Sequence, residues 1–213
     1  IDLNFYPTRE AHKSNTRHRP VGLGIMGTHG LLHKLNVDYD SKDAVLLCGK
    51  VQEFISYHAI LTSSKLAKEK GSYQSYKGSE WSYGNLPIDT YCRLMNDRNP
   101  QYLKSGKNNH YKPEDFETLE WNKVREHMLE HGMRNSNVMA IAPTATISYI
   151  QGCSQSIEPD YSVLFVYSTL SGEFTMINEH FVEMAKKKNI WCQELIDALK
   201  TADGDVMSID LPE

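Results

Sequence analysis

Asn137-Val138-Met139-Ala140-Ile141-Ala142-Pro143-Thr144-Ala145-Thr146-Ile147-Ser148 is the stretch of sequence that decides the fold. Its first half is a short apolar run between polar turns, which predicts a buried β-strand that ends at Pro143. Its second half is a turn of small hydroxyl residues. The N–H groups and hydroxyls of such a turn can bind a phosphate without a cation, although an ordinary helix cap has the same kind of sequence.

Predicted helices lie on both sides of this strand. The clearest runs from Lys42 to Lys70, where apolar residues recur every three or four positions and Gly71 follows as a stop. Asp40 or Ser41 is expected to cap its start. Further helices are expected within residues 21–35, 113–130, 178–189 and 191–201, a second strand at Leu164–Tyr167, and loops at 1–20 and 72–113. Helices alternating with short buried strands predict an α/β fold.

Composition excludes several classes of protein. The chain has 213 residues, of which 40% are hydrophobic, enough for one core, and its net charge is -4. This charge does not suggest a nucleic-acid partner, and no apolar run approaches the roughly 18 residues of a membrane span. The four cysteines, Cys48, Cys92, Cys153 and Cys192, show no CxxC spacing and suit a reducing compartment. We therefore expect a cytoplasmic protein that binds no metal.

A second motif, Gly22-Leu23-Gly24-Ile25-Met26-Gly27, matches the GxGxxG fingerprint of dinucleotide-binding proteins. That chemistry needs a strand directly before the first glycine, so that the turn presents its amides to a pyrophosphate. The preceding residues, 14–20, are polar and basic instead. Close packing at a helix start is the competing explanation for Gly22, Gly24 and Gly27.

Several segments in order resemble the large, catalytic subunit of class I ribonucleoside-diphosphate reductases. The matching segments are Asp2–Pro7, Arg17–Gly24, Leu66–Gly71, Gly132–Ser136, Ala142–Thr146, Ser156–Pro159 and Leu170–Phe174. Their order and spacing are family-like, and they cover nearly the whole chain. Ala145, where cobalamin-dependent relatives usually have Gly, favours class I.

The resemblance implies a fold and a site. The family forms a ten-stranded α/β barrel, so residues 1–213 are expected to be a single segment of its second half, without the ATP cone or the finger-loop cysteine. The family's loop for the substrate diphosphate corresponds to Thr144, Ala145, Thr146, Ile147 and Ser148. Ile147 replaces a hydroxyl residue of some relatives, so it could contribute only its backbone N–H.

The resemblance also implies which parts of the reaction depend on other segments and other proteins. In the family a thiyl radical abstracts the ribose 3′ hydrogen, and the product supplies DNA replication. The radical cysteine and its catalytic neighbours are expected upstream, and the redox cysteines downstream, so no catalytic residue and no cofactor are expected in this segment. The implied partners are the remaining segments of the catalytic subunit, a metal-containing small subunit that generates the radical, thioredoxin or glutaredoxin, and a nucleoside diphosphate.

Two other hypotheses stay open at this point. One is a nicotinamide-dependent dehydrogenase that uses Gly22, Gly24 and Gly27; a parallel strand that feeds directly into Gly22 would favour it. The other is a non-catalytic nucleotide-binding module, which would bind a nucleoside diphosphate without other segments.

Overall fold

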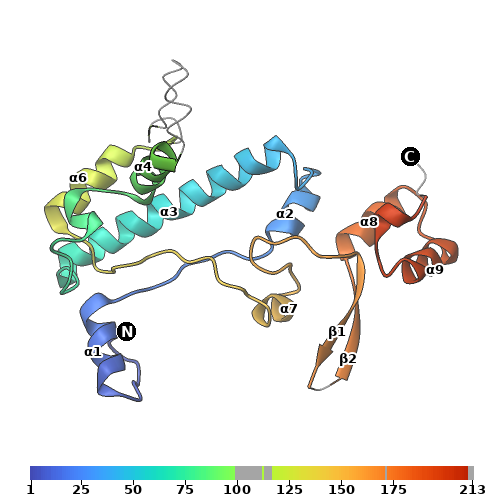
Figure 1. The fold of residues 1–213 in the computed structure, drawn as a ribbon, viewed down its shortest axis with the longest axis horizontal. Coiled ribbons are helices and arrows are strands. Elements are labelled where there is room, and N and C mark those ends of the chain that lie inside the picture. The colour runs from blue at the N-terminus through green and yellow to red at the C-terminus, as the bar shows by residue number, and fades with distance from the viewer. Residues whose placement is uncertain (99–111, 113–116, 171, 211–213) are drawn as a thin grey trace. The chain divides into compact units, whose positions relative to one another are not determined.

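The computed structural model describes residues 1–98, 112, 117–170 and 172–210, and these form two compact units (Figure 1). The first unit comprises Ile1–Gly24 and Leu46–Ile141, and the second comprises Ile25–Val45 and Ala142–Glu213. Each unit has its own set of buried residues, so each is described by itself.

Helix α3, Lys42–Lys70, has the bounds predicted from the sequence. Ser41 caps its start, since its Oγ accepts a hydrogen bond from the Ala44 N–H at 3.1 Å. Gly71 ends it with a φ of +79°, a left-handed conformation that glycine adopts without steric cost. The local signals at both ends therefore determine its length.

The core of the first unit lies between α3 and helix α6, Trp121–His131. Ile60 of α3 and Val124 and Met128 of α6 are completely buried. The loop after α3 and the segment after α6 complete this cluster with Tyr73, Leu86, Met133 and Val138. The helix predicted over 113–130 is confirmed from Trp121 onward and is wrong for residues 117–120, which are not helical; residues 113–116 lie outside the described residues.

Two helices of the first unit lie where loops were predicted. Helix α1, Arg9–His18, is capped by Thr8, whose Oγ1 accepts from the Ala11 N–H at 3.2 Å. Helix α4, Pro87–Arg98, begins with a proline, and Asp89 Oδ2 accepts from the N–H of Leu86 at 2.6 Å. A short 3-10 helix, η1, spans Glu80–Tyr83. The loop predictions over 1–20 and 72–113 hold for residues 1–8 and 72–79 and are wrong where these helices lie, because their capping residues were not recognised.

The strand predicted over 137–142 is only a short extended segment. Leu23 and Met139 form an isolated parallel bridge, in which the Leu23 N–H donates to Val138 O at 3.0 Å and the Ala140 N–H donates to Leu23 O at 3.1 Å. The burial prediction holds for Val138, which is 6% exposed, but not for Ile141, which is 61% exposed.

The second unit combines helices with a β-hairpin. Strands β1, Leu164–Thr169, and β2, Gly172–Ile177, pair antiparallel, with Val166 opposite Thr175. The helices are α2, Thr28–Lys34; α7, Ile147–Gln151; α8, Glu179–Lys187; α9, Gln193–Thr201; and the 3-10 helix η3, Val206–Ser208. Phe181, Ala185, Leu195 and Leu199 form its core between α8 and α9.

The structure tests the predicted fold only in part. Strand β1 and helices α8 and α9 confirm predicted elements, whereas strand β2 was missed. Within the described residues, the two strands form one two-stranded sheet, so the ten-stranded barrel and the single segment over 1–213 stay predictions. A separate finding is that none of the described helices has the length and apolar character needed to cross a membrane.

Glu53 of α3 holds the segment that precedes α6. Its Oε1 accepts hydrogen bonds from the N–H of Thr118 at 2.6 Å, the N–H of Leu119 at 3.1 Å and the Trp121 indole at 2.9 Å. Burial acts to raise the pKa of Glu53, but these hydrogen bonds outweigh it and lower the pKa below its ordinary value. The carboxylate therefore stabilises the folded state in its charged form.

We predict that Glu53→Gln lowers the free energy of unfolding at pH 7 by about 1–3 kcal/mol, because a charged acceptor of several hydrogen bonds is lost. Since folding lowers this pKa, the stabilisation is complete above the ordinary value of 4.5 and is lost as the pH falls below it. Urea unfolding at pH 7 and below pH 4 measures both effects. Glu69→Gln, at an exposed position of the same helix, is the control; equal losses in the two variants would contradict the prediction.

Candidate functional site

Residues 144–148 form a tight turn that continues into helix α7. The Ser148 N–H donates to the Thr144 carbonyl at 3.0 Å, and Thr146 occupies the position before the helix. Gly152, with a φ of +65°, ends α7 after five residues. The backbone of the turn is therefore shaped by bonds within a few residues, as the sequence predicted for a strand-to-turn segment.

Three consecutive amides of this turn are available to a ligand. The N–H groups of Ala145, Thr146 and Ile147 have no acceptor within the part of the chain that the structure describes. Ala145 and Thr146 are exposed, and Ile147 is 53% exposed. Consecutive free amides at a turn that leads into a helix can donate to the oxygens of one anion.

The hydroxyl groups of the turn differ in their surroundings. Thr144 is half-buried, and its Oγ1 accepts a hydrogen bond from the Ser156 N–H at 2.8 Å. Thr146 is exposed and makes no capping bond with its side chain. Ser148 is completely buried, and its Oγ has no partner among the described residues. The conformation thus separates the Ser148 side chain from the four other predicted residues.

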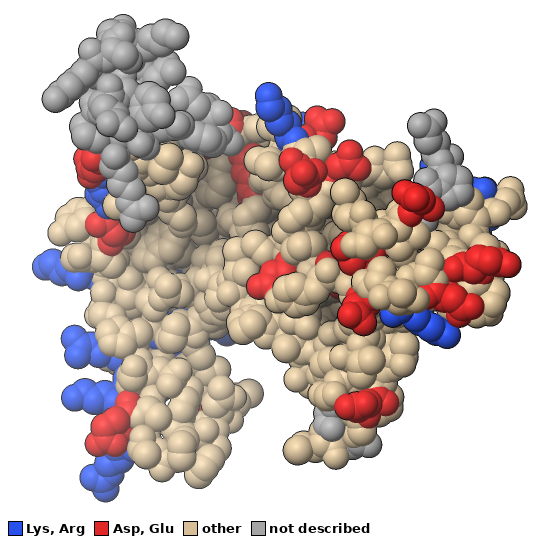
Figure 2. Space-filling model, turned by 45° about the vertical axis from the view of Figure 1, so that its right-hand side comes forward, with Lys and Arg blue, Asp and Glu red and all other residues tan. Residues whose placement is uncertain are grey.

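The charge of the second unit limits how it could bind an anion. Its residues include no arginine, and acidic residues outnumber lysines. On the face drawn in Figure 2, acidic side chains gather over the C-terminal helices α8 and α9. An anion at the turn would therefore be held by local N–H and O–H donors and not by a basic surface.

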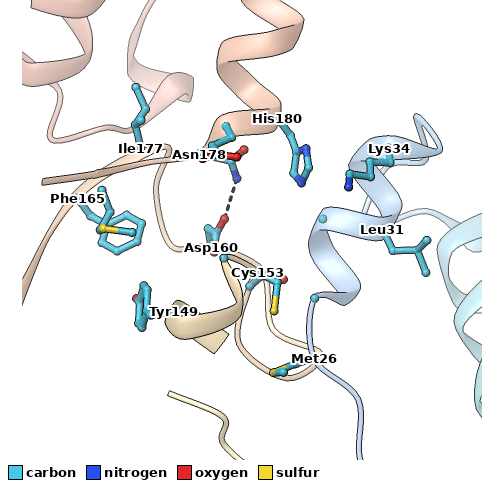
Figure 3. Close-up of a pocket in the computed structure, with 16 residues that line it drawn as sticks. Met26, Leu31, Lys34, Tyr149, Cys153, Asp160, Phe165, Ile177, Asn178 and His180 are labelled. Atoms are coloured by element: carbon cyan, nitrogen blue, oxygen red, sulfur yellow. Dashed lines mark hydrogen bonds between the residues drawn. The ribbon is translucent and has the colours of Figure 1, made fainter. Parts of the chain in front are cut away.

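A cavity of about 450 Å³ lies next to α7 within the second unit (Figure 3). Its apolar lining includes Met26 and Phe165, and its polar lining includes Lys34, Asp160 and His180. Tyr149 of α7 also lines it, whereas Thr144–Ser148 do not. The ring of Tyr149 stacks on Tyr167 of β1 with 4.2 Å between ring centroids. The predicted turn and the cavity are therefore neighbouring but distinct features.

Asp160 joins three elements beside this cavity. Its Oδ2 accepts from Asn178 Nδ2 at 2.7 Å, and its own N–H donates to His29 Nδ1 at 3.2 Å. Asn178 in turn caps α8, because its Oδ1 accepts from the Phe181 N–H at 3.0 Å. Bonding to His29 lowers the pKa of Asp160, although partial burial acts in the opposite direction. Asp160 therefore ties the end of the hairpin to α2, with its carboxylate bonded to Asn178 and its backbone N–H bonded to His29.

The sequence did not predict the contacts among His29, Asp160 and Asn178, because no local motif indicates them. His29 and Asp160 are separated by 131 positions, and neither belongs to a recognisable motif. Three imidazoles also lie together here: the ring of His33 is 4.4 Å from His29 and 5.7 Å from His180. Partial burial, followed by these two neighbours, lowers the pKa of His33. No group of three or more possible ligands is arranged to bind a metal among the described residues.

The cysteines carry no visible chemistry. None of the four forms a disulfide in the described structure: Cys92 is buried, Cys48 and Cys153 are half-buried, and Cys192 is exposed. Cys153 lines the cavity, but its spacing from the other cysteines gave no signal in the sequence.

The glycine motif serves close packing. A Cβ on Gly22 would lie 2.8 Å from the Cβ of Ala140, and Gly27 adopts a φ of +81° at the start of α2. No regular strand leads into Gly22, because α1 ends at His18 and the parallel pairing is limited to the bridge at Leu23 and one hydrogen bond from the Val21 N–H to Asn137 O. The arrangement therefore does not support the dinucleotide-binding hypothesis for Gly22, Gly24 and Gly27.

Comparison with known proteins gives consistent matches. A family model described as the barrel domain of ribonucleotide reductase matches residues 1–212. The ribonucleoside-diphosphate reductase subunit alpha of Chlamydia muridarum is 49% identical over 210 residues, which are 99% of this chain and 19% of that protein. The subunit alpha of Helicobacter pylori strain 26695 is 41% identical over 81% of this chain and 20% of its own length. The large subunit of Acanthamoeba polyphaga mimivirus is 34% identical over 98% of this chain and 22% of its own.

These relatives share one enzyme name, and the matches extend over nearly all of this chain. The chain spans about a fifth of the length of the curated relatives that it matches. With the family model covering residues 1–212, the chain belongs to the ribonucleotide reductase barrel-domain family.

Proposed function

We propose that this chain is part of the catalytic subunit of a ribonucleoside-diphosphate reductase, and that the turn Thr144–Ser148 binds the diphosphate of the substrate. Family membership supports the first part. The role of the turn rests on the N–H groups of Ala145, Thr146 and Ile147, which have no acceptor among the described residues. These residues belong to the segment that the resemblance assigns to the diphosphate.

The donors of the turn suit a diphosphate chemically. Phosphate oxygens accept hydrogen bonds only, and the turn offers N–H groups together with the hydroxyls of Thr144 and Thr146. Since the second unit has no arginine, these donors are the means by which its own residues would hold the anion. Ser148 would contribute by packing inside the turn, because its side chain is completely buried.

This segment would contribute to catalysis by positioning the substrate. In the proposed reaction a thiyl radical from another segment removes the 3′ hydrogen, the 2′ hydroxyl leaves as water, and a cysteine pair supplies the electrons. A diphosphate anchored at the turn fixes the ribose relative to that radical. A misplacement of about 1 Å could reduce the rate on the order of 100-fold.

Exposed apolar surface supports the need for further segments of the catalytic subunit. Leu46 and Phe54 of α3 are 63% and 58% exposed, and no third strand joins the two-stranded sheet among the described residues. Such surfaces are unstable in water unless other protein covers them. In the assembled enzyme we also propose a metal-containing small subunit as the radical source and thioredoxin or glutaredoxin as the reductant, in the cytoplasm.

We predict that Thr144→Ala combined with Thr146→Ala, in the full-length catalytic subunit, weakens nucleoside diphosphate binding by roughly tenfold or more. The reason is the loss of two donors to a charged ligand. Isothermal titration calorimetry measures the dissociation constant. Thr201→Ala, at an exposed threonine of α9, is the matched control and should leave the affinity unchanged. An unchanged affinity in the double variant would refute the role of the turn.

We also predict that this chain alone does not convert a ribonucleoside diphosphate to its deoxy form, because no radical or redox cysteine is assigned to it. Adding the remaining segments of the catalytic subunit and the small subunit should restore conversion of radiolabelled substrate. Turnover by the chain alone would contradict the prediction. Tight binding of a diphosphate by the chain alone, without any restored turnover, would instead support a non-catalytic nucleotide-binding module.

A further inference from the structure

We propose that Ser156 is a positioning residue for the diphosphate turn: its backbone N–H holds the Thr144 oxygen, which leaves the Thr144 hydroxyl hydrogen to the ligand. This inference rests on the proposed function and adds to it a residue outside the turn. The observation behind this inference is a hydrogen bond of 2.8 Å from the Ser156 N–H to Thr144 Oγ1. The two residues are twelve positions apart in sequence.

The geometry of a hydroxyl group gives this contact its consequence. A threonine hydroxyl has one hydrogen to donate and two positions at which it can accept. The Ser156 N–H occupies one accepting position, and Thr144 Oγ1 donates to no acceptor in the described part of the chain. Its hydrogen is therefore free for a phosphate oxygen. A hydroxyl that accepts one hydrogen bond also becomes a better donor of another.

The backbone at Ser156 has an unusual conformation, which directs its N–H toward Thr144 Oγ1. Its φ is +45°, in the left-handed region that residues other than glycine seldom adopt, and the residue is 4% exposed. Such a conformation persists only where surrounding contacts require it, and it is commonest at functional sites. The Oγ of Ser156 has no partner among the described residues, so the useful group is the amide and not the hydroxyl.

The loop around Ser156 is held on both sides. Before it, the Cys153 N–H donates to Ser148 O at 3.0 Å, and the Gly27 N–H donates to Ser154 O at 2.9 Å. After it, the Tyr39 hydroxyl donates to Ile157 O at 2.9 Å. These bonds connect the loop to α7, to the start of α2 and to the segment after α2. The Ser156 N–H is thus presented to Thr144 from a fixed support.

The test is a double-mutant cycle in the full-length catalytic subunit with its small subunit, with KM and kcat for a nucleoside diphosphate as the readout. Thr144→Val removes the hydroxyl at nearly constant volume, and Ser156→Val disfavours the left-handed backbone because valine is β-branched. We expect each single variant to raise KM several-fold, up to roughly tenfold for one lost bond to a charged group. The double variant should raise KM no further, because both changes act through one hydroxyl.

Three controls isolate the backbone N–H. Ser156→Gly keeps the N–H and suits the positive φ, so KM should equal that of the wild type. Thr144→Ser keeps the hydroxyl and should rescue most of the KM change. Asn189→Val places the same strain at another left-handed position, at the end of α8, and should leave KM unchanged.

The outcomes separate the two proposals. An unchanged KM in Thr144→Val overturns the role of the Thr144 hydroxyl in binding the diphosphate, and the role of Ser156 with it. A raised KM in Thr144→Val with an unchanged KM in Ser156→Val overturns only the role of Ser156, and so do effects that multiply in the double variant.

If Ser156→Val fails to fold, hydrogen exchange of residues 153–158 decides the question. A nucleoside diphosphate should increase protection of this segment in the wild type and not in Thr144→Val. Equal protection in both proteins overturns the inference.

Discussion

A backbone N–H needs an acceptor, and the N–H groups of Ala145, Thr146 and Ile147 have none within the described residues. They lie at the surface, where water can satisfy them, directly after a segment that is paired and partly buried. The loop that contains Ser156 supports the turn from behind by hydrogen bonds to Thr144 and Ser148. The turn is therefore preformed, and an anion that replaced water there would meet donors already in place.

Sequence signals predicted the elements whose causes are local. Helix α3 matched its predicted bounds because its apolar period, Ser41 and Gly71 all lie within the element or next to it. Helix α1 was missed because it is mostly polar and buries no residue, so its signals were limited to the cap at Thr8 and the charged residues at its two ends. Strand β2 was missed although Phe174 and Met176 alternate with Glu173 and Thr175, a pattern that is typical of a strand.

In the candidate site, too, features with local causes were predicted, and features that depend on tertiary contacts were not. The turn at 144–148 was found from its hydroxyl residues and from the family resemblance. The contact of Ser156 with Thr144 depends on a left-handed backbone at a serine, which no propensity predicts. The network of His29, Asp160 and Asn178 depends on the packing of α2 against the end of the hairpin. Such contacts follow from tertiary structure and leave no pattern along the chain.

The buried hydroxyls of the second unit have an energetic consequence. Thr28, Ser148, Ser154 and Ser156 each bury a side-chain oxygen that has no partner among the described residues. A buried polar group without a partner costs about 1–3 kcal/mol. The region behind the turn is thus expected to open locally more often than the apolar cores. Any ligand that bound only the closed form would therefore suppress this opening, and would do so more strongly at higher concentration.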